Sequence, residues 1–256
     1  MERVFPVRAF SDNYIWVLHD AGERLAVVVD PGDARPVVDA LDRRGMQLCA
    51  ILTTHHHPDH VGGVEQLLAR SDVPVYGPAG EHIPGRTQAL AEGDRVELPE
   101  LGVAFDVLDV PGHTAGHIAY VGDGMLFCGD TLFAGGCGRL FEGTAGQMHR
   151  SLGKFAALSG DTRVYCAHEY TLANLTFASH VEPENEALRQ RLETVRAQRA
   201  GDEITLPSTI REELATNPFL RSEAETVRRN AQEHWGRQFS TPVDVFAAVR
   251  AWKDTF

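Results

Sequence analysis

Continuous and alternating hydrophobic runs divide the first part of the chain into short strands and helices. Residues 14–18 follow the turn residues Ser11-Asp12-Asn13, and residues 25–29 are stopped by Asp30-Pro31-Gly32, so both runs predict strands. The hydrophobic positions that follow predict helices over 34–44 and 61–69 and strands over 49–53 and 73–76. Strands that alternate with helices in this way indicate a layered arrangement of sheet and helix.

The pattern changes twice further along the chain. Short runs with Gly and Pro turns predict antiparallel strands over 95–98, 103–110, 117–121 and 125–128, followed by a helix over 147–158 and a strand over 163–167. Helical spacing with many charges dominates after residue 170, over 171–200 and 222–252, on either side of a Pro-bearing segment, 206–219, that we expect to be irregular. We therefore predict an α+β fold, with a four-layer αββα sandwich over 1–170 and a small all-α domain over 171–256.

Composition places the chain among globular enzymes. Hydrophobic residues make up 43% of its 256 residues and charged residues 23%. No apolar run approaches the roughly 18 residues that a membrane-spanning helix needs, and the N-terminus lacks the features of a signal peptide. Four scattered cysteines without a C-x-x-C pair do not indicate disulfides or a zinc knuckle. We expect a cytoplasmic protein that binds no membrane.

The net charge of −12 restricts the choice of partners. A strongly acidic surface repels phosphate backbones, so nucleic acid is not expected as a partner. An anionic substrate would have to be held by local cations.

The segment from Thr53 to His60 contains four histidines and one aspartate within six positions. In an extended backbone, side chains two residues apart point to the same side, so His55 and His57 form one pair of donors and Asp59 with His60 forms another. Imidazole and carboxylate donors suit zinc, iron or manganese. One loop cannot complete the coordination of two metals, so further ligands must come from elsewhere.

Three further candidates follow predicted strands. His113 lies in Val-Pro-Gly-His-Thr, Asp130 in Cys-Gly-Asp-Thr, and His168 in Cys-Ala-His-Glu-Tyr. Ligand-type residues that repeatedly follow a strand are expected to converge at one edge of the sheets. By contrast, alternation turns His56 away from its neighbours, and the glycines around His117 argue against a helical i, i+4 metal pair with His113.

These motifs together resemble the metallo-β-lactamase superfamily, whose core motif is H-x-H-x-D-H. More narrowly, Gly-Cys-Gly-Arg-Leu-Phe-Glu-Gly at 136–143, Leu-Pro-Ser at 206–208 and Asn-Pro-Phe-Leu-Arg at 217–221 resemble glyoxalase II, the hydroxyacylglutathione hydrolases. The resemblance spans nearly the whole chain and implies an αββα domain, a binuclear metal site and a C-terminal helical domain that helps to bind glutathione. It assigns His55, His57 and His113 to a first metal, Asp59, His60 and His168 to a second, and Asp130 to a bridge between them.

The resemblance also implies a reaction. The expected substrate is S-D-lactoylglutathione or another S-(2-hydroxyacyl)glutathione, hydrolysed to glutathione and a 2-hydroxy acid in the second step of methylglyoxal detoxification. Asp59 would orient the attacking water or take its proton. The glutathione-binding residues would be Arg139, Tyr170, Arg250 and Lys253, in a monomer with two divalent metal ions, zinc being expected before iron or manganese. Arg139 stands where many relatives have Lys, and Phe141 replaces a Tyr found in some of them.

Other functions remain open at this point. A mononuclear iron persulfide dioxygenase would also use a glutathione adduct, but it needs only two histidines and one aspartate as ligands. Lactonases, β-lactamases and RNA-processing enzymes share H-x-H-x-D-H without the C-terminal motifs, and flavodiiron proteins resemble H-x-E-x-D, where this chain has His57. A non-catalytic metal-binding module is the alternative outside enzymes. No G-x-S-x-G or Cys–His–Asn signature supports a Ser or Cys nucleophile.

Overall fold

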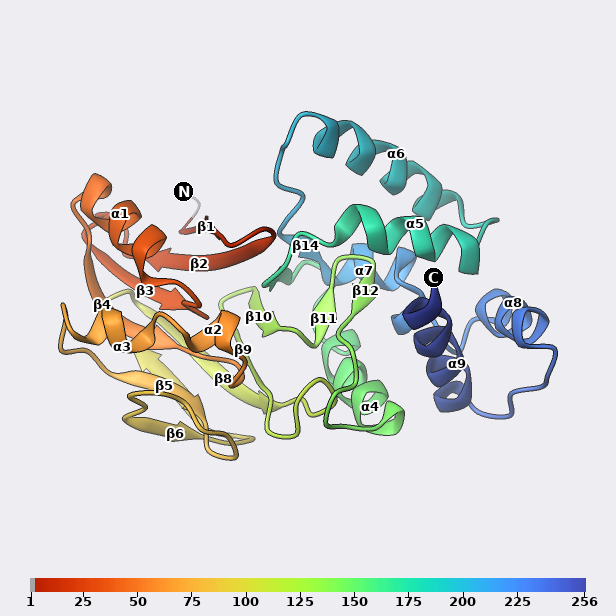
Figure 1. The fold of residues 1–256 in the computed structure, drawn as a ribbon, viewed down its shortest axis with the longest axis horizontal. Coiled ribbons are helices and arrows are strands. Elements are labelled where there is room, and N and C mark those ends of the chain that lie inside the picture. Colours follow the sequence, from red (N-terminus) through yellow and green to blue (C-terminus); the bar gives the residue numbers. More distant parts are fainter. Residues whose placement is uncertain (1–2) are drawn as a thin grey trace. The chain divides into compact units, whose positions relative to one another are not determined.

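The hydrophobic runs of the first part of the chain form a six-stranded mixed sheet in the computed structural model, which describes residues 3–256 (Figure 1). Neighbouring strands are antiparallel from β1 to β3 and parallel from β3 to β6. The strands lie in sequence order: β1 (Val4–Ala9), β2 (Asn13–His19), β3 (Leu25–Val29), β4 (Gln47–Leu52), β5 (Val75–Pro78) and β6 (Gln88–Leu90). The parallel part brings the carboxyl ends of β3, β4 and β5 to one edge of the sheet.

One face of this sheet is covered by α1 (Ala34–Arg44) and α3 (Val64–Leu68). Val37 and Leu41 of α1 join a buried hydrophobic cluster with sheet residues such as Val28 and Ile51. The helix begins at the side chain of Asp33, which accepts from Arg35 N, and ends at Gly45 with φ of 66°. The helical spacing over 34–44 is therefore confirmed.

The predicted helix over 61–69 is wrong in its extent, because two short helices occupy this region. They are α2 (Pro58–Val61) and α3, separated by Gly62 and Gly63. Pro58 stands at the first helical position of α2, where its missing N–H costs nothing. Gly63 packs against the backbone of Pro31 and Ala34, where a Cβ would come within 2.6 Å. The glycines therefore serve close packing and interrupt the helix.

The remaining strands before residue 130 form an antiparallel meander, as the sequence predicts. Its members are β7 (Arg95–Leu98), β8 (Val103–Asp109), β9 (Ile118–Gly122) and β10 (Met125–Gly129). The hydroxyl of Tyr120 in β9 donates to the carbonyl of Thr53 at 2.8 Å and so ties this meander to the end of β4. These elements belong to one compact unit, which comprises residues up to Asp109 and Thr114–Gly129.

A second compact unit comprises Val110–His113 and Asp130–Phe256. It contains the hairpin β11 (Leu132–Phe133) and β12 (Gly136–Cys137), the antiparallel pair β13 (Arg163–Cys166) and β14 (Ser208–Thr209), and a set of helices. The helices are α4 (Ala145–Ala156), α5 (Thr171–Val181), α6 (Glu186–Ala200), α7 (Ile210–Thr216), the 3-10 turn η1 (Pro218–Leu220), α8 (Glu225–Trp235) and α9 (Pro242–Thr255).

The segment 206–219 is not irregular as expected, since it contains β14, α7 and η1. Thr209 caps α7 by accepting from Glu212 N, and Asn217 caps η1 by accepting from Phe219 N. The seven-residue helix is too short to produce a clear hydrophobic period. To predict α7 from the sequence, the capping residues Thr209 and Asn217 would have to count for more than the prolines on either side.

The predicted domain boundary near residue 170 falls inside the second unit, between β13 and α5, and it stays a prediction. Within residues 3–256, no helix combines the length and the hydrophobicity required to cross a membrane.

Candidate metal centre

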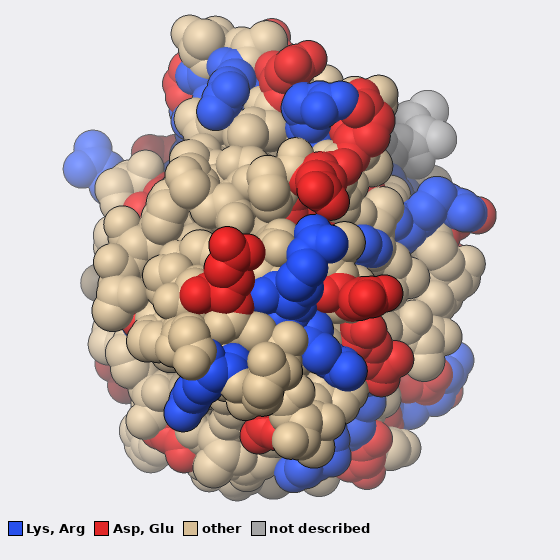
Figure 2. Space-filling model, turned by 90° about the vertical axis from the view of Figure 1, so that its right-hand side faces the viewer, with Lys and Arg blue, Asp and Glu red and all other residues tan. Residues whose placement is uncertain are grey.

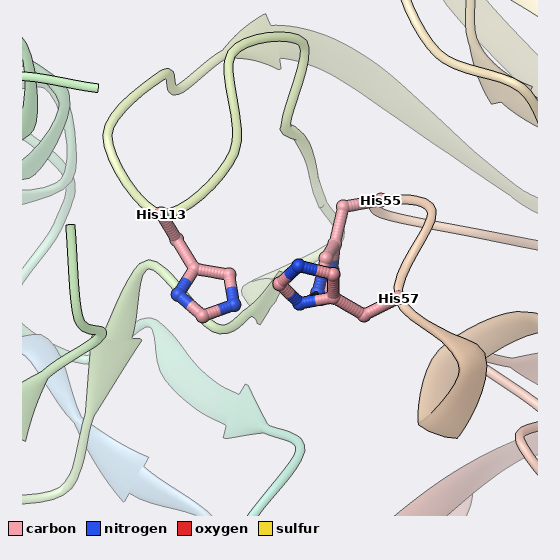
Figure 3. Close-up of side chains that lie close together, drawn as sticks. All are labelled: His55, His57 and His113. Atoms are coloured by element: carbon pink, nitrogen blue, oxygen red, sulfur yellow. Dashed lines mark hydrogen bonds between the residues drawn. The ribbon is translucent and has the colours of Figure 1, made fainter. Parts of the chain in front are cut away.

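The loop after β4 presents its histidines at the carboxyl end of a buried strand. Thr53, Thr54 and His55 are buried, and His57 immediately precedes α2. The Nε2 atom of His55 and the Nδ1 atom of His57 are 3.1 Å apart, and Figure 3 shows the two imidazoles turned toward each other. The extended backbone therefore brings this pair together as the spacing predicts.

The tautomer of His55 follows from its neighbours. The hydroxyl of Thr54 donates to Asp30 Oδ2 at 2.7 Å, so its oxygen accepts the Nδ1 proton of His55 at 3.1 Å. The Nε2 atom of His55 is then unprotonated and available to a metal.

Asp59 and His60 form the second pair of donors in this unit. His60 donates from Nδ1 to Asp30 Oδ2 at 3.0 Å, which leaves its Nε2 atom 3.5 Å from Asp59 Oδ2. Asn13 donates to the same Asp59 oxygen at 3.0 Å. Gly32, two residues after Asp30, lies against the backbone of Asp59, where a Cβ would collide with the Asp59 carbonyl oxygen. The end of β3 thus fixes the position of this pair.

In the second unit, Asp130 lies between two imidazoles. Its Oδ2 atom is 3.4 Å from His113 Nε2, and its Oδ1 atom is 3.4 Å from His168 Nε2. His113 donates from Nδ1 to the carbonyl of Arg139 at 2.9 Å, which leaves Nε2 unprotonated. All three residues are buried. A carboxylate that offers one oxygen toward each of two histidines has the arrangement of a bridging ligand.

The donor chemistry of both sets fits divalent transition metals. Imidazoles whose Nδ1 protons are held by a hydroxyl, a carboxylate and a backbone carbonyl are typical of histidine ligands, because the second hydrogen bond fixes the ring. Carboxylate and imidazole together accept zinc, iron and manganese. The residues therefore fit a metal centre and do not select one metal.

Sequence reasoning missed three polar residues: Asn13 and Asp30 bond to the candidate ligands Asp59 and His60, and Glu81 bonds to His56, which stands between two further candidates. Asp30 was interpreted only as part of a turn, although it follows a buried strand just as the predicted ligands do. It also accepts from Thr54 N at 2.7 Å and has a positive φ of 53°. Its place at the end of β3 was a usable signal, whereas Asn13 and Glu81 carried none.

The other two histidines of interest, His56 and His117, bond to groups outside the candidate ligand set. His56 bonds to Glu81 at 2.9 Å, but it does not turn away from both neighbours, because its ring lies edge-on to that of His57 with centroids 5.0 Å apart. His117 lies in no helix; its ring stacks on His55 with centroids 4.5 Å apart, and its Nδ1 atom donates to Ile118 O at 2.9 Å.

The predicted glutathione-binding residues all lie in the second unit. Tyr170 precedes α5, and its ring stacks on His168 with centroids 4.7 Å apart. Arg250 of α9 is 6% exposed and donates to the carbonyl of Cys137 at 2.9 Å and to Asp254 at 3.0 Å. Arg139 lies 3.5 Å from the same Asp254 oxygen. Arg139 and Arg250 therefore lie next to each other at the same oxygen of Asp254.

Lys253 lies one turn from Arg250 and has an unusual environment. It donates to the carbonyl of Ala173 at 3.3 Å and lies over the rings of Phe177 and Phe256. Burial, and then the charge of Arg250, lower the pKa of Lys253 to about 8. Figure 2 shows the side of the molecule that carries α8 and α9, where basic and acidic side chains are interspersed.

Comparison with known proteins identifies the class. A family model described as the metallo-beta-lactamase superfamily matches residues 9–168, and one described as the hydroxyacylglutathione hydrolase C-terminus matches residues 169–256. The crystal structure of ETHE1 from Myxococcus xanthus has a TM-score of 0.66 at 24% identity and covers 98% of each chain. The chain belongs to the metallo-β-lactamase superfamily, and its predicted α+β fold class is confirmed.

Curated relatives narrow the assignment. The hydroxyacylglutathione hydrolase of Alkalilimnicola ehrlichii is 60% identical over 99% of both chains, and that of Pseudomonas paraeruginosa is 56% identical over 100% of both. Within the superfamily, the chain is a member of the hydroxyacylglutathione hydrolase family, also called glyoxalase II, as its motifs predict. The crystal structure of TTHA1623 in a di-iron-bound form is 27% identical, with a TM-score of 0.60, and covers 84% of this chain and all of that one.

Proposed function

We propose that this chain hydrolyses S-(2-hydroxyacyl)glutathione thioesters, S-D-lactoylglutathione first among them, to glutathione and a 2-hydroxy acid. The observation that carries the proposal is the filled set of seven metal-ligand positions in a chain 60% identical to a hydroxyacylglutathione hydrolase along its whole length. The reaction would be the second step of methylglyoxal detoxification, carried out in the cytoplasm by a monomer. No property of the site favours the persulfide dioxygenase alternative over this one.

The proposed centre would hold two divalent metals. His55, His57 and His113 would hold the first, Asp59, His60 and His168 would hold the second, and Asp130 would be shared between them. The placement of Asp130 between His113 and His168 supports the bridging role. Zinc is the first candidate, with iron and manganese as alternatives, and the relative TTHA1623 was solved with two irons.

When bound, two divalent metals would lower the pKa of a water molecule toward neutrality and polarise the thioester carbonyl. Asp59 would orient the attacking water or accept its proton, and Asn13 restricts the Asp59 carboxylate by donating to Oδ2. The leaving group is a thiolate, and because a thiol has a pKa near 8.5 it departs without a strong general acid. This explains why the site needs no protonated residue beside the sulfur.

The cations of α9 and Arg139 bind the carboxylates of glutathione, with Tyr170 as a hydroxyl donor. Arg250 is held in place by Cys137 O and Asp254, so its guanidinium is ordered before substrate arrives. An ordered cation loses less entropy on binding, which supports a role in recognition.

Hydrolysis of S-D-lactoylglutathione by the metal-replete protein tests the proposal. We expect stoichiometric glutathione and D-lactate, and a fall in kcat of about 10²- to 10⁴-fold in Asp59→Asn, because a group that orients and deprotonates the nucleophile contributes that much. Asp123→Asn, in the β9–β10 turn, is a matched control, since Asn tolerates its φ of 52°. Absence of hydrolysis in the wild type, with oxygen uptake on glutathione persulfide instead, would establish the alternative.

A further inference from the structure

Glu81, in the loop after β5, is a buried acid that belongs to no metal-ligand motif. Its side chain is 4% exposed. The loop that carries it is held by Arg86, which donates to the Glu81 carbonyl at 2.6 Å and also to the carbonyl of Pro78. A buried carboxylate is costly unless hydrogen bonds compensate its charge, so its partners indicate what it does.

Four donors point to this carboxylate, two at each oxygen. The Oε2 atom accepts from His56 N at 2.6 Å and from His56 Nδ1 at 2.9 Å. The Oε1 atom accepts from Gly116 N at 3.0 Å and from the hydroxyl of Thr114. A carboxylate has about four acceptor sites, so Glu81 is saturated, and hydrogen bonds to an ionised acceptor are stronger than neutral ones.

The donors come from two loops that carry predicted ligands. His56 stands between His55 and His57, and fixing its backbone N–H fixes the direction in which its neighbours point. Thr114 follows His113 directly in the chain. Gly116 precedes His117, whose ring stacks on His55. A Cβ at Gly116 would lie 2.7 Å from Glu81 Cγ, so the glycine admits the close approach.

We propose that Glu81 is a positioning residue that joins the loop of residues 53–60 to the loop of residues 113–117 and sets the geometry of one metal site. The site it supports is that of His55, His57 and His113, so the inference rests on the ligand assignment in the proposed function. Asp59 and His60 have their own support from Asn13 and Asp30. Loss of Glu81 therefore affects the two metal sites unequally.

Zinc titration of the apo protein against a chromophoric chelator tests this. In Glu81→Gln, an amide NH₂ group replaces one carboxylate oxygen. The two donors that bonded to this oxygen then face another donor in place of an acceptor. We expect one of the two zinc equivalents to bind about 10- to 100-fold more weakly, as is typical when a residue supporting a ligand is lost. The other equivalent keeps its wild-type affinity. The matched control is Glu97→Gln on β7, whose side chain is 77% exposed.

Selective weakening distinguishes positioning from a general contribution to folding, which would weaken both equivalents together. Wild-type affinity at both sites, or an equal loss at both, overturns the inference. Should Glu81→Gln not fold, as judged by circular dichroism, Thr114→Val removes one donor and leaves the carboxylate; we expect a smaller weakening of the same equivalent, and unchanged or equal affinities overturn the inference again. Zinc binding is measured without substrate, so the result stands whether or not the protein hydrolyses a glutathione thioester.

Discussion

At the scale of single residues, side chains that are ordinary in isolation acquire special properties from their neighbours. His55, His60 and His113 each have Nδ1 held by a partner, and each therefore presents Nε2 as an acceptor. Neighbours also change the properties of Lys253. Burial and the nearby Arg250 lower its pKa, because the charged ammonium is disfavoured there. Both effects arise from contacts that no single residue type reveals.

Lys253 predicts a pH dependence of substrate binding. Its pKa is lowered to about 8 by burial and then by Arg250, while Cys137 and Asp254 act in the opposite direction. If the ammonium binds a glutathione carboxylate, KM rises as pH increases from 7 to 9, by roughly tenfold at most for one proton lost per site. Lys253→Arg keeps its charge over this range and should flatten the rise. Lys154→Arg, at the only other lysine in the sequence, should not. An equal rise in Lys253→Arg would remove Lys253 from the binding site.

At the scale of elements, a buried network joins α6, α7 and the β11–β12 hairpin. Arg191 donates to Glu213 at 2.7 Å and to Thr216 at 2.6 Å. Glu213 also accepts from Gly135 N at 2.8 Å, in the hairpin, and from Asn217. The Asn217 amide in turn donates to two carbonyls of the hairpin. This explains why the Asn-Pro-Phe motif follows α7: its amide anchors the segment that leads to Arg139.

Arg191→Met should destabilise the protein by about 3–5 kcal/mol, because it leaves Glu213 buried with its charge uncompensated. Urea unfolding followed by circular dichroism measures the change. Replacing Glu213 as well, by Gln, should recover part of the loss. Arg211→Met, which removes an exposed pair with Asp161, is the control and should leave stability unchanged. A similar midpoint for Arg191→Met and Arg211→Met would show that the network does not stabilise the fold.

At the scale of the whole molecule, acidic residues outnumber basic ones and give a net charge of −12. Many of the arginine side chains lie beside a carboxylate. In the second unit Arg199, Arg221 and Arg229 each face a carboxylate. Arg139 and Arg250 share Asp254. A glutathione carboxylate would therefore meet two arginine side chains that Asp254 already orients. The acidic total is compatible with an anionic substrate only because these cations are local.

Metal removal should destabilise the whole chain. Ligands gathered only in the folded state make metal binding part of the folding free energy, worth about 4 kcal/mol at a thousand times Kd. For a chain of this length, treatment with a chelator should lower Tm by about 10 °C, as measured by differential scanning calorimetry. Zinc should restore Tm, whereas calcium should not, since it prefers oxygen ligands. An unchanged Tm in protein shown to be free of metal would contradict the proposed centre.

Much of the fold could be predicted because its elements carry local signals. Continuous apolar runs indicated β2, β3 and β4, and helical spacing indicated α1. Short elements were missed or misjudged, among them β6, the β11–β12 hairpin and α7, because a few residues give no measurable period. The helix over 61–69 failed for another reason: Gly62 and Gly63 pack closely against the loop between β3 and α1 and against the first residue of α1, which a local pattern does not contain.

The sequence by itself determined the family, the fold class and which side chains are candidate ligands. The histidines and aspartates follow strands at fixed spacing, so they can be recognised within short segments of the chain. Only the tertiary structure decided which acids hold the candidate ligands, the residues beside them and the candidate substrate-binding arginines. Asp30 reaches His60 and Thr54, Glu81 reaches His56 and Thr114, and Asp254 lies between Arg139 and Arg250. All but the last of these contacts, Asp254 with Arg250, join residues that lie 24 or more positions apart, so hydrophobic periodicity and motif spacing could not reveal them.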